Sequence, residues 1–437
     1  MAESSAKNLL KLLEKSGIAD QDELKESLGS LSAKLDGSAV GTQQLTDHLI
    51  ESGIITQWHA GKLLAGKYKG FFLDKYKLLG HLGTGGMSSV YLAESKNTRK
   101  KRAIKVLPKK KVSDKSYLDR FYREGKAAAS LNHPNIVRVY DINNSGDTHY
   151  MVMEYVQGKD LYETVRDDGA MPIDEVVDSI FQSAEGLLHA HEKGMVHRDI
   201  KPANLLRTES NSIKILDLGL ALFNSEGEES LTVLYNEKVM GTADYLSPEQ
   251  AVNSHEVDHR ADIYSLGCTL YFLITGRPPF DKGTLAQRIA MHQSKEPDNI
   301  LEIREDCPQA IVDICTKMMR KNPDDRFADC NEVMKTLTEY RNSPDTFKLD
   351  LPPPTPVVEK KPEPAKEVDT EPAVAKSNDR YSIDTMMPGS SSTRIANAPA
   401  IRRKRRKSTP KWLLPTLIVG MISALVAVLV VMSLLVG

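Results

Sequence analysis

Residues 195–206 read MVHRDIKPANLL, in which charged and amide side chains stand close together between apolar residues. Two shorter stretches follow in order along the chain: ILDLGLA at residues 215–221, with Asp217, and GTADYLSPEQ at residues 241–250, with Glu249. The polar side chains of the first stretch are His197, Arg198, Asp199, Lys201 and Asn204. The order and joint presence of the three stretches indicate a functional site more strongly than any one of them does.

Upstream, residues 82–93 read LGTGGMSSVYLA and lie between two strand-like runs, YKLLGHL and SVYLAE. A Rossmann fingerprint needs a helix after the glycines, and a Walker A loop needs G-K-[ST], so neither is favoured. A glycine hairpin between strands is the arrangement of a protein kinase phosphate loop. Ser88, however, stands where the third glycine of that motif is expected. By itself this stretch leaves open a working phosphate loop, the relic of one, or a glycine turn.

Two charged residues follow the glycine stretch. RAIKVL places Lys105 on the next strand among apolar neighbours, as an ammonium that points into a cleft requires. Glu124, in RFYREGKAAASL, lies on a helical pattern and can pair with that lysine. Either residue alone could be a surface charge. The presence of both residues in this order disfavours that interpretation.

Together these stretches resemble protein kinases of the Hanks type, and specifically the membrane-tethered eukaryotic-like Ser/Thr kinases of bacteria. The resemblance covers residues 75–341. It implies an α+β, two-lobed protein kinase fold, with a small β-rich lobe followed by a larger helical lobe. The periodicity agrees, because short apolar runs come first and long helical patterns such as VVDSIFQSAEGLLHAHEKG come later.

By this resemblance, Asp199 would accept the proton of the substrate hydroxyl while Lys201 steadies the γ-phosphate of ATP. Asn204 and Asp217 would hold Mg²⁺, with Mn²⁺ as an alternative metal. The predicted catalytic residues are Asp199, Lys201, Lys105 and Glu124. A lysine two positions after the catalytic aspartate resembles Ser/Thr kinases, so protein Ser/Thr phosphorylation is the predicted activity.

The resemblance also implies an adenine site, with hydrogen bonds to the backbone of Glu154 and Val156 behind a gatekeeper, Met153. Apolar side chains would sandwich the ring, and Asp160 would reach the ribose, cap a helix, or do both. The predicted nucleotide-binding residues are Leu82, Gly83, Thr84, Gly85, Gly86, Val90, Ala103, Lys105, Met153, Glu154, Val156, Asp160 and Leu206.

The chain departs from the family pattern at Ser88, at Leu218 in place of phenylalanine, and at Ser247 in place of alanine. None of these changes removes a charged or metal-binding group, and Glu249 can still pair with Arg326. The alternative function is a pseudokinase scaffold that binds nucleotide or partners without transfer. The presence of all four of Lys105, Asp199, Asn204 and Asp217 favours the active enzyme.

Arg198 beside the catalytic aspartate resembles kinases that are switched on by phosphorylation of the activation loop. Ser230 and Thr232 are the favoured acceptors for autophosphorylation, ahead of Ser225 and Tyr235. Acidic residues in the same loop could partly replace a phosphate, although a solvated acidic loop is the simpler interpretation.

Residues 1–70 contain a weak internal repeat, LLKLLEKSGIADQDELKESL and LTDHLIESGIITQWHAGKLL. Each copy predicts a helix that ends at a glycine, Gly17 or Gly53, and a second helix capped by Asp20 or Thr56. We expect a small helical module that serves docking or packing, with Trp58 as a core residue.

The C-terminal part has a different composition. Residues 343–401 are rich in proline and poor in large apolar residues, which predicts a disordered linker. Residues 412–436 carry no charge and would span about 37 Å as a helix, more than the roughly 30 Å of a bilayer core. The basic segment 402–411 before them predicts contact with anionic headgroups and a cytoplasmic kinase domain.

With 58 basic and 59 acidic residues, the chain has no global field that would attract nucleic acid. The four cysteines show no zinc-ligand spacing and are expected to be buried thiols. The expected partners are ATP, protein substrates and, through one C-terminal helix, a membrane, with no nucleic acid. A homodimer through the small lobe or the span is left open.

Overall fold

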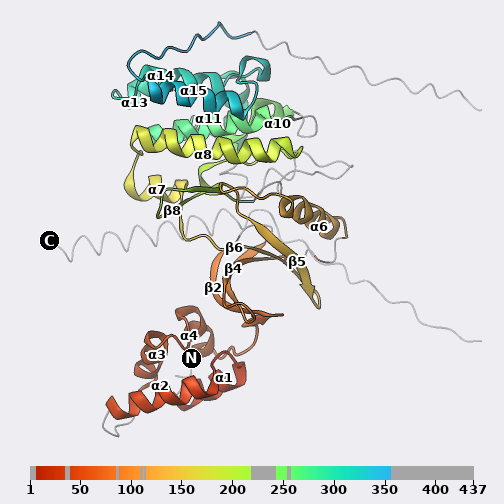
Figure 1. Cartoon of the computed structure of the whole chain (residues 1–437), viewed down its shortest axis with the longest axis vertical. Coiled ribbons are helices and arrows are strands. Elements are labelled where there is room, and N and C mark those ends of the chain that lie inside the picture. Colours follow the sequence, from red (N-terminus) through yellow and green to blue (C-terminus); the bar gives the residue numbers. More distant parts are fainter. Residues whose placement is uncertain are drawn as a thin grey trace, which may run out of the picture. The chain divides into compact units, whose positions relative to one another are not determined.

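The computed structural model describes residues 6–34, 40–84, 88–108, 112, 115–217, 243–252 and 257–355. Contacts divide the chain into two units, Met1–Lys361 and Pro362–Gly437, and all described residues belong to the first. Figure 1 shows helices at the start of the chain, then strands, then a larger group of helices. The predicted order of a helical module, a β-rich lobe and a helical lobe is confirmed for the described residues.

The N-terminal module consists of two helix pairs, as the internal repeat predicts. Gly17 and Gly53 follow the first helix of each pair with φ of 65° and 73°, a left-handed conformation that glycine adopts without strain. Asp20 accepts hydrogen bonds from the backbone of α2, and Thr56 caps α4. The helices are α1 (Ala6–Ser16), α2 (Gln21–Lys34), α3 (Thr42–Glu51) and α4 (Gln57–Leu64).

The small lobe is built on an antiparallel sheet that, in the described residues, has the order β1-β2-β3-β4-β6-β5. At the start of β2 buried and partly exposed residues alternate, whereas in β4 three consecutive residues, Ala103 to Lys105, are buried. Helix α6 (Lys115–Ala129) packs beside β5. The strands are β1 (Phe72–Leu73), β2 (Tyr76–Thr84), β3 (Ser89–Ser95), β4 (Lys101–Val106), β5 (Val139–Ser145) and β6 (Thr148–Glu154).

The large lobe begins with a small sheet of order β7-β8-β9 and continues as helices. Its strands are β7 (Gly158–Asp160), β8 (Leu205–Thr208) and β9 (Ile213–Ile215). The helices are α7 (Leu161–Asp168), α8 (Ile173–Glu192), α10 (Pro248–Val252), α11 (Arg260–Thr275), α12 (Leu285–Ser294), α13 (Ile300–Ile303), α14 (Gln309–Met318) and α15 (Cys330–Asn342). Short 3-10 turns are η1 (Pro202–Asn204), η3 (Ala243–Tyr245) and η4 (Pro323–Asp325).

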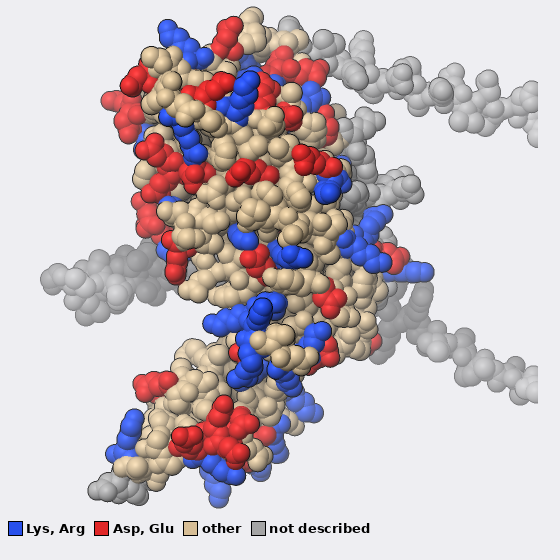
Figure 2. All heavy atoms as spheres, in the orientation of Figure 1, with Lys and Arg blue, Asp and Glu red and all other residues tan. Residues whose placement is uncertain are grey.

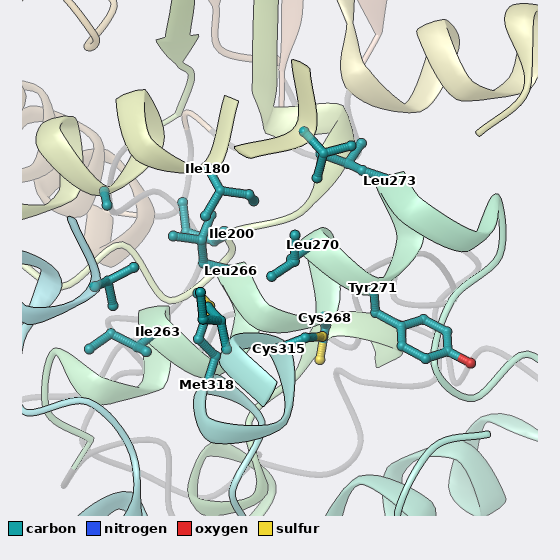
Figure 3. Packing of buried hydrophobic residues seen from close by; sticks show 14 of the residues in the cluster. Ile180, Ile200, Ile263, Leu266, Cys268, Leu270, Tyr271, Leu273, Cys315 and Met318 are labelled. Carbon is teal, nitrogen blue, oxygen red and sulfur yellow. The ribbon is translucent and has the colours of Figure 1, made fainter. Parts of the chain in front are cut away.

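Helix α11 forms the centre of the large lobe, because every residue from Ala261 to Ile274 is buried. Helices α8 and α14 pack against it. Figure 3 shows Leu266 and Leu270 of α11 close to Ile180, Ile200 and Met318. Because α11 is covered on all sides, it forms the base on which the loops of the lobe rest.

The cysteines confirm the sequence prediction, since all four are free and buried. Burial raises the pKa of the Cys268 thiol to about 12, which leaves it protonated and inert at neutral pH.

The first residues of the predicted disordered linker are ordered instead. Phe347 and Leu349 pack against the core of the large lobe, and Phe347 lies edge-on to Tyr340 with ring centroids 6.1 Å apart. The Thr355 hydroxyl donates to Asp325 at 2.7 Å. Residues 343–355 of the predicted linker therefore contact the large lobe, whereas the prediction for residues 356–401 lies outside the described residues.

Several predicted features fall on residues that the structure does not describe. Among the described residues, no helix is both long enough and apolar enough to cross a membrane. The features outside the described residues are Gly85, Gly86, Leu218, Ser225, Ser230, Thr232, Tyr235, the side chain of Glu124, residues 356–401, the basic segment 402–411 and the predicted span 412–436.

Candidate active site

The loop after α8 is held by a buried carboxylate on α11. Asp262 accepts hydrogen bonds from the backbone N–H groups of His197 (2.8 Å) and Arg198 (2.7 Å), and from Nε2 of His191 (2.8 Å). Burial raises the pKa of Asp262, but these donors and the two histidines lower it more, so the carboxyl stays ionised. The base of the loop is thereby fixed to the most buried helix of the lobe.

This anchoring keeps a strained backbone in place. Arg198 has φ of 64°, a left-handed conformation that is costly for a long side chain, and its carbonyl accepts a hydrogen bond from Gln250 at 2.9 Å. The His197 ring accepts from the backbone N–H of Asp199 at Nδ1 (3.2 Å) and donates from Nε2 to the Leu216 carbonyl (2.9 Å). His197 therefore connects the loop to the strand end that precedes Asp217.

Asp199, Lys201 and Asn204 form one hydrogen-bonded group. Lys201 Nζ lies 2.9 Å from both carboxylate oxygens of Asp199. Asn204 Nδ2 donates to the Asp199 carbonyl at 2.7 Å and to its Oδ2 at 3.0 Å. The ammonium keeps the carboxylate oriented, while the amide nitrogen of Asn204 is engaged and its Oδ1 remains the atom suited to a metal.

Asp217 lies next to this group, because the Leu216 N–H donates to the Asn204 carbonyl at 2.9 Å. Its φ is 52°, and its Oδ1 accepts a hydrogen bond from Lys105 Nζ at 2.6 Å. Burial raises the pKa of Asp217, but the Lys105 ammonium lowers it more, so its pKa is below the ordinary value. The described partner of Lys105 is thus Asp217, whereas the predicted partner, Glu124, has a side chain outside the described set.

The strand register aligns the predicted nucleotide-binding residues of the small lobe. Val90 on β3 lies opposite Lys105 on β4, and Ala103 lies opposite Met153 on β6. Alternate residues of a strand share a face, so Ala103 and Lys105 are on the same side of the sheet. Gly83, near the end of β2, lies opposite Val90.

At the tip of β2, Leu82 is exposed and the Thr84 hydroxyl is 2.8 Å from Nε2 of His81. Ser88 is buried directly before β3, which shows that a small side chain is accommodated at the third glycine position.

The segment after β6 leads to the large lobe. Glu154 forms an ion pair with Lys214 at 3.0 Å, and Val156 follows the strand end. Asp160 lies opposite Leu206 in the β7–β8 ladder and accepts from the backbone N–H of Glu163 at 2.7 Å. The helix-cap role of Asp160 is confirmed; its predicted contact with ribose remains a prediction.

The described donor atoms fit a hard divalent cation. Asn204 and Asp217 supply an amide and a carboxylate oxygen on neighbouring segments, and Mg²⁺ is bound in such sites by one or two carboxylates together with substrate phosphates. Among the described residues, no group of three or more His, Cys, Asp or Glu side chains could hold a metal alone. A site completed by the phosphates of a nucleotide agrees with both facts.

The predicted pair of Glu249 and Arg326 is confirmed. The guanidinium donates to both carboxylate oxygens at 2.7 Å, and its side chain is completely buried. Ser247 is also buried, and its hydroxyl donates to Gln250 at 2.9 Å, so the change from alanine gains a partner inside the core.

Asp262 is the functional residue that the sequence interpretation missed. Its signal was present, because it is the one charged residue in the mainly apolar stretch 261–274. A carboxylate on a buried helix requires partners, and its partners are the backbone N–H groups of His197 and Arg198 and the ring of His191.

The comparisons with known proteins agree with this geometry. The protein kinase domain family model matches residues 76–337, which is more than half of the chain. The chain belongs to the protein kinase family. Serine/threonine-protein kinase PknB of Mycobacterium leprae is 38% identical over 268 residues, which cover 60% of this chain and 42% of the relative. A probable serine/threonine-protein kinase of Clostridium acetobutylicum is 36% identical over 272 residues, with 62% and 40% covered.

Among solved structures, the PknI kinase domain of Mycobacterium tuberculosis matches 62% of this chain and 98% of its own length, with 28% identity and a TM-score of 0.49. The chain spans about two fifths of the length of the curated relatives named above. Both curated relatives carry the name of serine/threonine-protein kinases.

Proposed function

We propose that this kinase-family chain transfers the γ-phosphoryl group of ATP to Ser and Thr hydroxyls of proteins. The observation that carries the proposal is the hydrogen-bonded group of Asp199, Lys201 and Asn204 beside the Lys105–Asp217 pair. These five side chains supply a base, two cations and two metal-binding groups for phosphoryl transfer, and the predicted pairing of Lys105 with Glu124 would complete the set.

In the proposed reaction, the substrate hydroxyl oxygen attacks the γ-phosphorus and the bond to the β,γ-bridging oxygen breaks, which releases ADP. The hydroxyl proton passes to the Asp199 carboxylate, whose orientation is set by Lys201 and Asn204. Lys201 also places a positive charge where the γ-phosphate carries negative charge. Lys105 is the cation for the other phosphates.

Asn204 and Asp217 would hold Mg²⁺ or Mn²⁺, which when bound neutralises charge on the phosphates. Lys105 pairs with Asp217 in the described geometry, and we propose that it moves to phosphate oxygens and to Glu124 when nucleotide binds. The predicted adenine contacts at Glu154 and Val156, beside Met153, belong to the same proposal.

We further propose that the chain is a single-pass membrane protein with a cytoplasmic kinase domain. The support is the uncharged stretch 412–436 directly after the basic segment 402–411. Activation by autophosphorylation at Ser230 or Thr232 is part of the proposal, supported by Arg198 beside the catalytic aspartate. Mass spectrometry of the active protein tests this part, and an active protein with an unmodified loop would refute it.

The activity is tested by incubating the full-length protein with γ-labelled ATP, Mg²⁺ and a general protein substrate, followed by phosphoamino acid analysis. The proposal predicts label on phosphoserine and phosphothreonine. Label on phosphotyrosine alone would refute the substrate class. Nucleotide binding without any transfer would favour the alternative, a pseudokinase scaffold.

A further inference from the structure

Helix α4 of the N-terminal module is hydrogen-bonded to strand β2, which carries the phosphate loop. The Thr56 hydroxyl donates to the Leu79 carbonyl at 2.6 Å, and Nε2 of His59 donates to the Leu78 carbonyl at 2.6 Å. The same two side chains cap their own helix, since Thr56 Oγ1 accepts from the His59 N–H at 3.2 Å. The helix cap and the strand contact are therefore a single network.

The contact falls on an irregularity of the strand. In the β2–β3 ladder Leu78 lies opposite Ala93 and Gly80 opposite Leu92, which makes Leu79 the extra residue of a β-bulge. A bulge residue lies outside the regular ladder, so its carbonyl has to find another donor. Thr56 supplies that donor. The pairing of β1 with β2 ends at Lys77, and the next two residues of β2, Leu78 and Leu79, have carbonyls that accept from α4 and its cap.

The returning strand of the loop also contacts α4. The ring centroids of Trp58 and Tyr91 on β3 are 6.2 Å apart, and those of Tyr91 and His81 on β2 are 5.2 Å apart. Trp58 packs against both the module core and the small-lobe core. Helix α4 thus contacts both strands that enter and leave the glycine loop.

His59 is held in one protonation state. Its Nδ1 accepts from the Thr56 N–H at 3.1 Å, which leaves the proton on Nε2 for the Leu78 carbonyl. Burial lowers the pKa of His59 to about 4, so the ring is neutral at pH 7. The network is therefore fully formed under the conditions in which a cytoplasmic kinase would work.

We propose that α4 is a positioning element for the strand ends that carry the phosphate loop, in which Thr56 and His59 fix the bulge at Leu79 and thereby favour ATP binding. This inference rests on the proposed binding of ATP at that loop. Gly83 and Val90 stand opposite each other at its base, a few residues beyond the bulge. Strand ends that are already held in place lose less conformational freedom when a nucleotide binds, so the module contributes to the affinity for ATP.

The first test compares two substitutions at one position in the full-length protein. Thr56→Ser keeps the hydroxyl, whereas Thr56→Val keeps the shape and loses both hydrogen bonds. We expect Thr56→Val to raise KM for ATP about fivefold to tenfold, with kcat at saturating ATP within about twofold and Thr56→Ser close to wild type. His48→Ala is the control, because its Nε2 contacts the Ser27 carbonyl inside the module. An unchanged KM in Thr56→Val, or an equal rise in His48→Ala, would overturn the proposal.

A second pair of variants examines His59. In His59→Asn the side chain still accepts from the Thr56 N–H but is too short to donate to the Leu78 carbonyl. In His59→Gln the amide nitrogen lies near the position of Nε2 and can donate to that carbonyl. We expect His59→Asn to raise KM for ATP more than His59→Gln does. The same KM for both variants would contradict a positioning role for the bond to Leu78.

Hydrogen exchange on the wild-type protein tests the coupling without any substitution. If α4 favours ATP binding, then by reciprocity a bound ATP analogue must favour the packing of α4. We expect a non-hydrolysable ATP analogue with Mg²⁺ to slow exchange in α4 and leave α1 unchanged. Slower exchange in β2 and β3 without a change in α4 would overturn this inference alone. No protection at any of these strands would instead overturn the proposed ATP site, and the inference with it.

Discussion

The pair of Glu249 and Arg326 allows a stability prediction, because the arginine is buried and all of its contacts in the described residues are known. Arg326 donates to both Glu249 oxygens and to the carbonyls of Arg320 (2.7 Å), Arg260 (2.9 Å) and Lys321 (3.1 Å). Its side chain is fully buried, and that of Glu249 is 23% exposed. The guanidinium therefore depends on Glu249 for its counter-charge.

Glu249→Gln removes that charge and keeps the shape. Loss of one partner of a buried ion pair lowers the free energy of unfolding by about 3–5 kcal/mol. Because Glu249 is partly exposed, we expect a loss of about 3 kcal/mol in this variant. In a domain of this size, roughly 2–4 °C of melting temperature is lost per kcal/mol, so we expect a fall of about 10 °C. Thermal unfolding followed by circular dichroism, together with urea unfolding, measures both values.

The control is Asp324→Asn, which breaks an ion pair with Arg260 in which the Asp324 side chain is 78% exposed. An exposed pair contributes about 0–1 kcal/mol, so this variant should unfold almost as the wild type does. A double variant, Glu249→Gln with Arg326→Met, should lose less than the sum of its single changes. If Glu249→Gln costs no more than Asp324→Asn, the reasoning about the buried charge is refuted.

Three further predictions concern the catalytic loop, the module and the glycine stretch. Asp262→Asn should lower kcat about 100-fold, because the backbone N–H groups of the loop lose an acceptor and the reacting groups shift. A kcat within about threefold of the wild-type value in steady-state assays would contradict this. The pKa of His59 is about 4 in the folded protein and about 6.5 when unfolded, so stability should fall by up to about 3 kcal/mol as pH drops through that window. In urea unfolding, the free energy of unfolding should depend less on pH in His59→Gln than in the wild type, and an equal dependence would contradict this prediction. Ser88→Gly should change KM for ATP by only about threefold, because the Ser88 side chain is already accommodated before β3. A change in KM above about tenfold would contradict that prediction.

The sequence predicted those features that depend on local signals. Gly17, Gly53 and Thr56 mark helix boundaries through left-handed backbone and capping, and both kinds of signal act within a few residues. The pairing of Glu249 with Arg326 was predicted from the family resemblance, which carries information about distant contacts.

What the sequence could not supply depends on tertiary contacts. Asp262 acts through amides on a loop far away in the chain, and nothing beside it in the sequence shows which amides those are. The bulge at Leu79 and its donor Thr56 come together only when the module packs on the small lobe. Phe347 and Leu349 are apolar residues in a proline-rich segment, and composition alone predicted disorder for them.

The central claim is that Asp199 serves phosphoryl transfer and not the fold. The most direct measurement is Mg²⁺-dependent transfer from labelled ATP by the wild-type protein and by Asp199→Asn, with nucleotide binding measured on the same samples. We expect comparable nucleotide binding by the two proteins and a loss of transfer of at least about 100-fold in Asp199→Asn. Equal transfer by both proteins would contradict it.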